Sequence, residues 1–276
     1  MKSKVAANEG AIAQDAGSKD ASKRTSITRG SILVTGASRG IGAAIAEALA
    51  EAGYQVGCVS RSGDLPARPG ASAIARSRWV ALKADVTDAA QLRATFDAFA
   101  AQAGPAGSLV GLVNNAGVHA DAPSAELPRE QWDRVMDTNA WSVIAGCQAA
   151  YPHLAAAGGA LIVNIGSFFD KIGVKRNLAY CTSKAAVGAI TRVLAVEWAG
   201  KKIRVIDVAP GYIATDLNRD SMSAGPLREY LEKRIPGRVP GTSEDVGRFV
   251  AALFTVGSPF LTGETIYIDG AQGVAH

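Results

Sequence analysis

Tyr180 and Lys184 stand four residues apart in the segment YCTSK, inside an apolar stretch that predicts a helix over residues 178–199. Side chains four residues apart share one face of a helix, so the phenol and the ammonium point the same way. A free tyrosine has a pKa of ~10, and an ammonium ~4 Å away at an effective dielectric of ~20 lowers it by ~3 units. Such a pair could exchange a proton with a substrate near neutral pH. The pair alone is equally consistent with ordinary surface residues of a helix.

Two further polar residues could serve the same chemistry. Ser167 ends the apolar run ALIVNIGS, and Asn139 interrupts the apolar helical stretch WDRVMDTNAWSVI. Asparagine is a poor helix former, which indicates a task for the Asn139 amide. If residues 160–167 form a parallel strand, its carboxyl end lies at the ligand crevice together with the start of the 178–199 helix. We therefore expect Ser167 and Tyr180 to converge there.

A glycine-rich turn, TGASRGIG, follows the first apolar run and carries Gly36, Gly40 and Gly42. Glycine accepts positive φ and lets a ligand approach the backbone closely. A helix that begins near Gly40 would present free N–H groups and the positive end of its dipole to a phosphate. The spacing differs from the usual Gly-x-Gly-x-x-Gly fingerprint, but its place between a strand and a helix predicts a dinucleotide site.

The end of the second apolar run, CVSRSG, indicates which dinucleotide is bound. An NAD site needs a carboxylate there for the ribose 2′-hydroxyl, whereas this chain has Ser60 and Arg61, and Arg39 lies in the glycine turn. Two guanidinium groups suit a 2′-phosphate. We therefore expect NADP(H), with NAD(H) as the alternative if both arginines are only solvated. Asp85 could accept from the adenine amino group, because Asp88 is better placed to cap the next helix.

The order of elements predicts the fold. Seven short apolar runs alternate with about six helical stretches, and the runs are continuous rather than alternating with polar residues. This pattern is typical of a Rossmann-type, doubly wound α/β fold, in which helices cover both faces of a seven-stranded parallel sheet. Residues 30–276 are expected to form a single dinucleotide-binding and catalytic domain. Pro66, Pro69 and Gly70 indicate a short helix or none between the second and third strands.

Composition excludes several classes of function. The chain has 276 residues, of which 48% are hydrophobic, and its net charge is +4. Three of these charges belong to residues 1–30, so the body is nearly neutral and no nucleic-acid surface is expected. No apolar run reaches the ~20 residues of a membrane span. The polar, small-residue tail at 1–29 is expected to be disordered. Three cysteines and three histidines form no ligand pattern, which indicates no metal site and a reducing, cytoplasmic location.

The ordered set of TGASRGIG, NNAG, Asn139, Ser167, YCTSK and APGYIAT resembles the short-chain dehydrogenase/reductase family from about residue 31 to 270. The surrounding pattern is similar to 3-oxoacyl-carrier-protein reductases and gluconate 5-dehydrogenases. The resemblance implies a catalytic set in which Tyr180 transfers a proton, Lys184 holds the nicotinamide ribose, Ser167 binds the substrate oxygen and Asn139 holds a water. The implied cofactor-binding residues are Gly36, Ser38, Arg39, Gly40, Ile41, Ser60, Arg61, Asp85, Val86, Asn115, Ala116, Gly117, Tyr180, Lys184, Pro210, Gly211, Ile213 and Thr215.

The function expected from these features is hydride transfer between NADP(H) and a ketone or secondary alcohol, with a 3-oxoacyl-like or sugar-acid-like ketone as substrate. The alternatives are an NAD-dependent alcohol or polyol dehydrogenase and a dinucleotide-sensing protein without turnover. The family resemblance implies a homotetramer or homodimer built through helices 130–156 and 178–199. Phe168 and Phe169 could form an apolar substrate wall. An anionic substrate could meet basic side chains, unless these are solvated: Lys175, Arg176, Arg219 and Arg228.

Overall fold

The computed structural model describes residues 29–102, 108–216, 218, 220, 222 and 224–275. Nearly all of the tail at 1–29, for which disorder was expected, lies outside the described residues, as does Arg219. Within the described part of the chain, no helix combines the length and the hydrophobicity that crossing a membrane requires.

A seven-stranded, fully parallel sheet forms the centre of the molecule, as the sequence predicts. Its strand order is β3-β2-β1-β4-β5-β6-β9. The strands are β1 (Ser31–Thr35), β2 (Gln55–Ser60), β3 (Trp79–Lys83), β4 (Leu109–Asn114), β5 (Ala160–Ile165), β6 (Ile203–Pro210) and β9 (Thr265–Ile268). Strand order reverses between β1 and β4, which creates the crevice at the carboxyl ends of these strands where open α/β sheets bind ligands.

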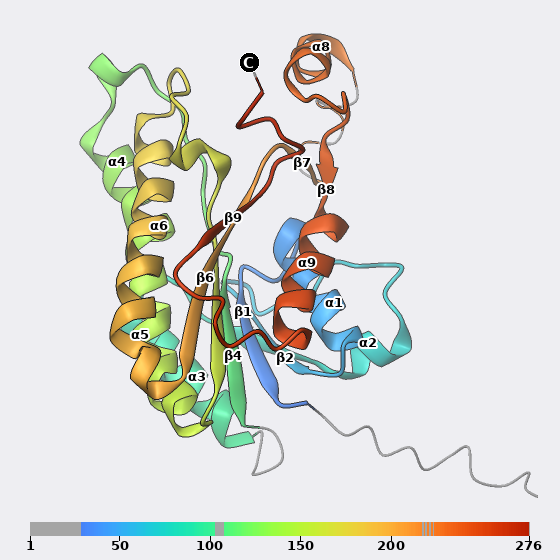
Figure 1. Ribbon diagram of the computed structural model, residues 1–276, viewed down its shortest axis with the longest axis vertical. Helices are drawn as coiled ribbons and strands as arrows, with labels where there is room; N and C mark the ends of the chain where they lie inside the picture. Colours follow the sequence, from blue (N-terminus) through green and yellow to red (C-terminus); the bar gives the residue numbers. More distant parts are fainter. Residues whose placement is uncertain are drawn as a thin grey trace, which may run out of the picture.

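Helices cover both faces of the sheet. On one face lie α3 (Ala89–Gln102), α4 (Arg129–Met136), α5 (Ser142–Ala156) and α6 (Leu178–Trp198); on the other lie α1 (Gly40–Glu51), α2 (Ala73–Ser77) and α9 (Ser243–Thr255) (Figure 1). The proline-rich segment before β3 holds only the five residues of α2, as expected. A small sheet of β7 (Ile213–Ala214) and β8 (Gly241–Thr242) leads from β6 to α8 (Gly225–Arg234) and on to α9.

The expected long helix over residues 130–156 is interrupted by one widened turn. Between α4 and α5, the π-helical segment η3 (Asp137–Trp141) carries Asn139. Single π turns inside α-helices are frequent at functional sites, because the extra residue changes the direction of nearby side chains and carbonyls. The poor helix former that stood out in the sequence therefore lies at the one irregular turn of this run.

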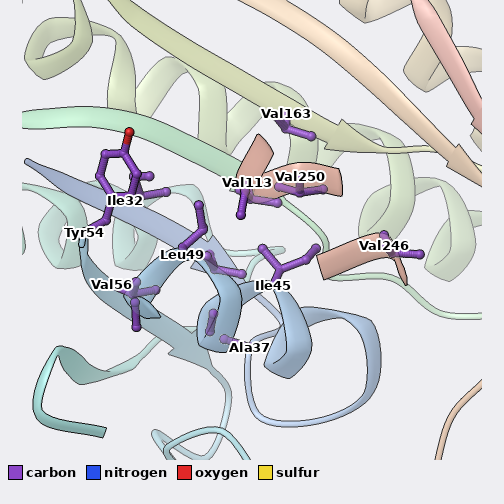
Figure 2. Packing of buried hydrophobic residues seen from close by; sticks show 14 of the residues in the cluster. Ile32, Ala37, Ile45, Leu49, Tyr54, Val56, Val113, Val163, Val246 and Val250 are labelled. Atoms are coloured by element: carbon purple, nitrogen blue, oxygen red, sulfur yellow. The ribbon is translucent and has the colours of Figure 1, made fainter. Parts of the chain in front are cut away.

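Two large apolar clusters of the described residues form the core, one on each face of the sheet, and a small third cluster lies around α8. Figure 2 shows side chains of α1 and α9 meeting side chains that project from the central strands. The residues that make this contact are Ile45, Leu49, Val246 and Val250 from the helices and Ile32, Val113 and Val163 from the strands. Each buried side chain of this size contributes roughly 1.5–3 kcal/mol. The core fixes the strand ends, and with them the residues of the site.

Candidate active site

The glycine turn folds tightly where β1 meets α1. Gly36 and Gly40 have φ values of 66° and 56°, which glycine adopts without strain. A Cβ on Gly36 would lie 2.9 Å from the Ala116 Cα, and one on Gly42 would collide with the Gly36 carbonyl oxygen. Helix α1 begins at Gly40, as predicted, so its first N–H groups face the crevice. The glycines therefore leave open a space that any other residue would fill.

This space is a cavity of about 640 Å³ along the carboxyl ends of β1, β2, β3 and β4. It brings together thirteen of the residues that the sequence assigned to a cofactor: Gly36, Ser38, Arg39, Gly40, Ile41, Ser60, Arg61, Asp85, Val86, Asn115, Ala116, Gly117 and Thr215. Its volume and glycine floor suit an extended dinucleotide. The catalytic candidates do not line it but lie beyond its inner end, where Val118 joins the cavity wall to Asn139.

Two arginines lie at the outer end of the cavity, and β2 contributes no carboxylate there. Ser60, the last residue of β2, is buried, and its hydroxyl accepts a hydrogen bond from Gly63 N at 3.0 Å. Arg39 and Arg61 are exposed, and the structure records no hydrogen bond or ion pair of either guanidinium with the described residues. The pKa of Asp85 is lowered, first by hydrogen bonds from the Thr87 backbone and hydroxyl and then by the charge of Arg61. This end of the cavity can therefore receive a dianionic phosphate.

Tyr180, Ser167 and Lys184 converge as the sequence predicts. The Tyr180 hydroxyl lies close enough to Ser167 for that side chain to lower the pKa of Tyr180, and the Ser167 hydroxyl accepts from Phe169 N at 3.3 Å. The Lys184 ammonium lies 5.7 Å from the centroid of the Tyr180 ring and donates to the Ile165 carbonyl at 2.8 Å. Lys184 is buried, with 5% of its surface exposed. A phenol, a hydroxyl and a cation therefore meet at the carboxyl end of β5.

The expected lowering of the Tyr180 pKa is not found. Burial raises the pKa of Tyr180, and the interaction with Ser167 offsets only part of this rise. The reason is that the phenolate would lose its solvation, while the ammonium is bound to the Ile165 carbonyl and lies 5.7 Å from the centroid of the ring. Burial also lowers the pKa of Lys184 to about 8, an effect that the charge of Asp207 opposes. In this state Tyr180 is a neutral phenol, able to donate a proton.

Asn139 holds the loop that follows β4. Its Oδ1 accepts from Val118 N at 2.8 Å, and its Nδ2 donates to Val118 O at 2.8 Å and to Ser183 Oγ at 3.1 Å. Both amide hydrogens are therefore used, and one lone pair of Oδ1 remains for a water. The role of Asn139 as a water holder stays a prediction, whereas its role in fixing the loop at Val118 follows from the geometry.

Aromatic rings pack against the Tyr180 ring and against one another. Phe169 packs edge-on against Tyr180 with a centroid distance of 5.8 Å, and Phe168 and Phe169 both contact Tyr212. His119 also packs against Tyr180, with a centroid distance of 4.9 Å. We refer to Phe168, Phe169, Tyr212 and His119 as the aromatic wall. The expectation that Phe168 and Phe169 form an apolar surface at the site agrees with this geometry.

The basic residues considered for an anionic substrate are mostly engaged elsewhere. Arg176 pairs with Asp121 at 2.9 Å, and Arg228 pairs with Glu232 at 2.6 Å along α8. Lys175 is exposed. The interpretation as solvated surface charges therefore fits Arg176 and Arg228 better than substrate binding does.

The segment after β6 closes the other side of the crevice. Gly211 packs so closely on β9 that a Cβ would lie 2.7 Å from the Asp269 Cα. Ile213 is buried in β7, and the Thr215 hydroxyl donates to Asn218 Oδ1 at 3.3 Å. Thr215 also lies beside Gly40, 3.7 Å from the position of a Cβ there. The turn begun by Pro210 therefore brings residues of β7 to the glycine turn.

Comparison with known proteins places the chain in a family. A family model described as enoyl-(acyl carrier protein) reductase matches residues 36–272. A 3-oxoacyl-[acyl-carrier-protein] reductase of Staphylococcus aureus is 35% identical over 245 residues, which cover 88% of this chain and 97% of that protein. The chain belongs to the short-chain dehydrogenase/reductase family. The resemblance stated from sequence motifs is thus confirmed, and the protein is an NAD(P)-dependent oxidoreductase acting on CH–OH groups.

Other members of the family are similarly close to this short-chain dehydrogenase/reductase. The 3beta-hydroxysteroid dehydrogenase 1 of Eggerthella lenta is 35% identical over 244 residues, covering 87% of this chain and 92% of that protein. A crystal structure of a gluconate 5-dehydrogenase from Burkholderia cenocepacia, in complex with NADP and tartrate, superposes with a TM-score of 0.79. It is 30% identical, and the match covers 90% of this chain and 97% of that one.

Sequence reasoning missed several residues of the enzyme's crevice. The Thr35 hydroxyl accepts from Asn115 N at 3.0 Å and Ala116 N at 3.1 Å, and thereby ties the NNAG loop to the glycine turn. Arg134 and Thr138 line the cavity from the helical run. Thr35 could have been found, because it ends the first strand next to Gly36. Arg134 has no such signal, since its approach depends on how α4 packs.

A second cavity of the enzyme, of about 590 Å³, lies at the amino ends of the strands, on the side of the sheet away from the crevice. Arg29, Lys202 and Arg204 lie on its wall, together with backbone that follows the ends of α5 and α6. Positive side chains are favoured at the negative ends of helix dipoles. The basic character of this cavity is therefore accounted for by the helix ends.

Proposed function

We propose that the protein is an NADPH-dependent ketone reductase whose substrate is an apolar ketone. The observation that carries the proposal is the convergence of Tyr180, Ser167 and Lys184 at the carboxyl end of β5, next to a glycine-floored cavity with two arginines at its outer end. The residues fit a dinucleotide, because a side chain on Gly36 or Gly42 would fill the cradle. Arg39 and Arg61 would hold a 2′-phosphate, and Lys184 and Thr215 would hold the nicotinamide end.

The proton chemistry follows from the described side chains. When bound, the nicotinamide supplies the hydride that reduces the carbonyl carbon. Ser167 donates a hydrogen bond to the substrate oxygen, and Tyr180 gives its phenolic proton to that oxygen as the carbonyl becomes an alcohol. Lys184 stabilises the phenolate that remains on Tyr180. Because burial raises the pKa of Tyr180, the group is protonated at neutral pH, which favours reduction over alcohol oxidation.

The aromatic wall supports an apolar substrate. Phe168 packs on Tyr212 and Phe169 packs on Tyr180, so that apolar ring surface adjoins the proton donor, and Arg176 and Arg228 are paired with carboxylates. Burying an anionic substrate against such rings without a counter-charge is costly. A cyclic, aryl or long-chain ketone therefore suits the site better than a sugar acid, the other substrate class considered from sequence.

A substrate panel tests this proposal. The purified protein is assayed with NADPH and a series of apolar ketones, sugar acids and polyols, and the reverse reaction with NADP is assayed on the matching alcohols. Turnover of apolar ketones with NADPH is expected, with kcat/KM higher than for the polyols by at least tenfold. Turnover of polyols with NAD alone would establish the polyol dehydrogenase, and tight NADPH binding without any turnover would establish a sensing protein.

Cofactor choice has its own test at Arg61. In Arg61→Asp, the new carboxylate repels the 2′-phosphate and can accept from a ribose 2′-hydroxyl, so kcat/KM with NADPH is expected to fall by about 100-fold, or about 3 kcal/mol. Activity with NADH is retained or rises. Arg93→Asp, on the exposed face of α3 and outside the cavity, is the matched control for charge. An unchanged preference in Arg61→Asp would show that the arginines do not select the cofactor.

The proposed enzyme assembles as a homotetramer or homodimer in the cytoplasm. Support for assembly comes from Trp141, Val193 and Val196, large apolar side chains that remain 47%, 53% and 81% exposed on η3 and α6. Support for a reducing compartment comes from the cysteines, since Cys58, Cys147 and Cys181 are all free thiols.

A further inference from the structure

A row of polar side chains crosses four neighbouring strands beneath α6. Asn114, Asn164, Asp207 and Thr265 are register partners on β4, β5, β6 and β9. Asn114 Nδ2 donates to Asn164 Oδ1 at 2.9 Å, and Asn164 Nδ2 donates to Thr191 Oγ1 on α6 at 2.9 Å. We call these four strand residues the polar row. The amides and hydroxyls of the row satisfy one another, as buried polar groups must.

Asp207 is different, because it brings a carboxylate into this buried row. None of its surface is exposed, and only one of its oxygens, Oδ2, has a partner, the Thr265 hydroxyl at 3.1 Å. Among the described residues, Oδ1 has no hydrogen-bond partner. This oxygen occupies the place where Gly166 would carry a Cβ, and Gly188 on α6 leaves room on the other side. A buried, half-satisfied carboxylate costs several kcal/mol unless an opposite charge accompanies it.

The available opposite charge is that of Lys184. Its ammonium donates to the Ile165 carbonyl, and Ile165 is the register partner of Val208, the residue after Asp207. The Ile165 carbonyl that holds the ammonium is therefore one residue out of register with Asp207 on the neighbouring strand, and Lys184 reaches it from α6. Each affects the other: the charge of Asp207 raises the pKa of Lys184, and the charge of Lys184 lowers the pKa of Asp207. Burial opposes both effects and brings the two pKa values to about 8 and about 6.

Other charged and titratable groups face Asp207 from each element packed around it. From η4 (Phe168–Asp170), the charge of Asp170 raises the pKa of Asp207. From β9, the Tyr267 hydroxyl donates to Asp170 at 2.9 Å, and Lys171 lies 3.5 Å over its ring. From α6, Arg192 extends beside Gly188, with Nη1 3.4 Å from the position of a Cβ there. Lys184 is the cation of this group that also lies at the Tyr180 ring.

We propose that Asp207 is a positioning residue for catalysis, which keeps the Lys184 ammonium charged and directed toward Tyr180. The inference rests on the proposed role of Lys184 and extends it to a residue that never touches substrate or cofactor. When Tyr180 gives its proton to the substrate oxygen, the phenolate is stabilised by a cation whose own charge depends on the buried carboxylate behind it. Loss of that carboxylate lets Lys184 lose its proton at lower pH.

The test is the pH profile of ketone reduction in Asp207→Asn, which keeps the shape of the side chain and removes its charge. In the profile of kcat against pH, the alkaline limb is set by deprotonation of Lys184, and it is expected to shift to lower pH by about one unit. The ratio of wild-type to variant kcat is therefore expected to rise about tenfold between pH 6 and pH 9. Thr265→Val, which removes the one hydrogen bond to Oδ2, is expected to shift the limb in the same direction by less.

Two further variants make the outcome decisive. Thr191→Val disturbs the polar row at Asn164 without touching Asp207, and its limb is expected to stay in place. Asp207 would be only structural if Asp207→Asn lost kcat by the same factor at every pH and the alkaline limb of Thr265→Val also stayed in place. Lys184→Met separates the two proposals: if it keeps full activity, the proposed role of Lys184 fails, whereas an inactive Lys184→Met with an unshifted Asp207→Asn limb overturns only the role of Asp207.

Discussion

At the scale of single residues, the site depends on a phenol in an environment that keeps it protonated. Ser167 lowers the pKa of the Tyr180 hydroxyl, and the rings of Phe169 and His119 pack against the Tyr180 ring. Burial disfavours the phenolate more than the interaction with Ser167 stabilises it. The same burial that makes Tyr180 a dependable proton donor therefore makes it a poor base until a cofactor and substrate change its surroundings.

Removal of the phenolic hydroxyl tests that assignment. In Tyr180→Phe, kcat for ketone reduction is expected to fall by roughly 10²–10⁴-fold, the usual contribution of a positioned acid. The ring contacts with His119 and Phe169 remain, so NADPH affinity measured by fluorescence titration should change by less than about threefold. Undiminished turnover would remove Tyr180 from the mechanism.

The buried carboxylate of Asp207 has a consequence for stability that activity does not report. Burial raises its pKa from 3.8 to about 6, so between these values the folded protein binds more protons than the unfolded chain. The resulting contribution to stability is present below pH 3.8 and is lost as pH rises through 6, which amounts to about 3 kcal/mol.

Urea unfolding of the wild type and Asp207→Asn across pH 4 to 7 measures this contribution. The free energy of unfolding of the wild type should fall relative to that of the variant as pH rises from 4 to 6, and the difference should level off above pH 7. Parallel curves over this range would mean that Asp207 ionises as easily in the folded protein as in water.

At the scale of elements, the β1-turn-α1 unit shows how much local sequence can specify. The expected strand, the turn and the helix start at Gly40 all agree with the structure, because glycine positions and apolar periodicity act over a few residues. The long helix expected over 130–156 agrees less well. Its π turn at Asn139 results from contacts of that side chain with Val118 and Ser183, which lie 21 and 44 residues away along the chain.

Gly42→Ala tests the turn as a unit. The added methyl group would collide with the Gly36 carbonyl, and relief of the collision must move the turn on which the cavity is built. Overpacking of this kind costs about 1–3 kcal/mol, so the midpoint of thermal unfolding should drop and NADPH affinity should fall by at least tenfold. Gly70→Ala is the matched control, since a Cβ there meets no atom within 4 Å. Equal cofactor affinity in the two variants would contradict the close packing of the turn.

At the scale of the whole molecule, the parallel sheet sets the geometry of the site. Residues from β1, β2, β3, β4, β5 and β6 reach one crevice because all these strands run in the same direction and end at the same edge. Helices α5 and α6 cover one face of the sheet, and the outer surface of α6 retains exposed apolar side chains. Such a face on a folded chain indicates contact with another protein surface.

Val196→Glu tests whether that contact is a second copy of the chain. A charge introduced on the outer face of α6 should disfavour association, so light scattering is expected to report a smaller species than for the wild type. Val239→Glu, at another exposed valine outside α5 and α6, should leave the molar mass unchanged. The same mass for wild type and Val196→Glu would place any interface elsewhere.

The sequence by itself determined the order of strands and helices along the chain, the glycine cradle and most of the residues that meet in the crevice. These features follow from short-range rules, since periodicity, turn glycines and the direction of parallel strands depend on residue type and spacing. Only the tertiary structure decided the pKa values of the groups in the site. Burial raises the pKa of Tyr180 and lowers that of Lys184 to about 8, although the charge of Asp207, brought close by strand register, opposes the shift at Lys184; burial thus outweighs spacing along one helix.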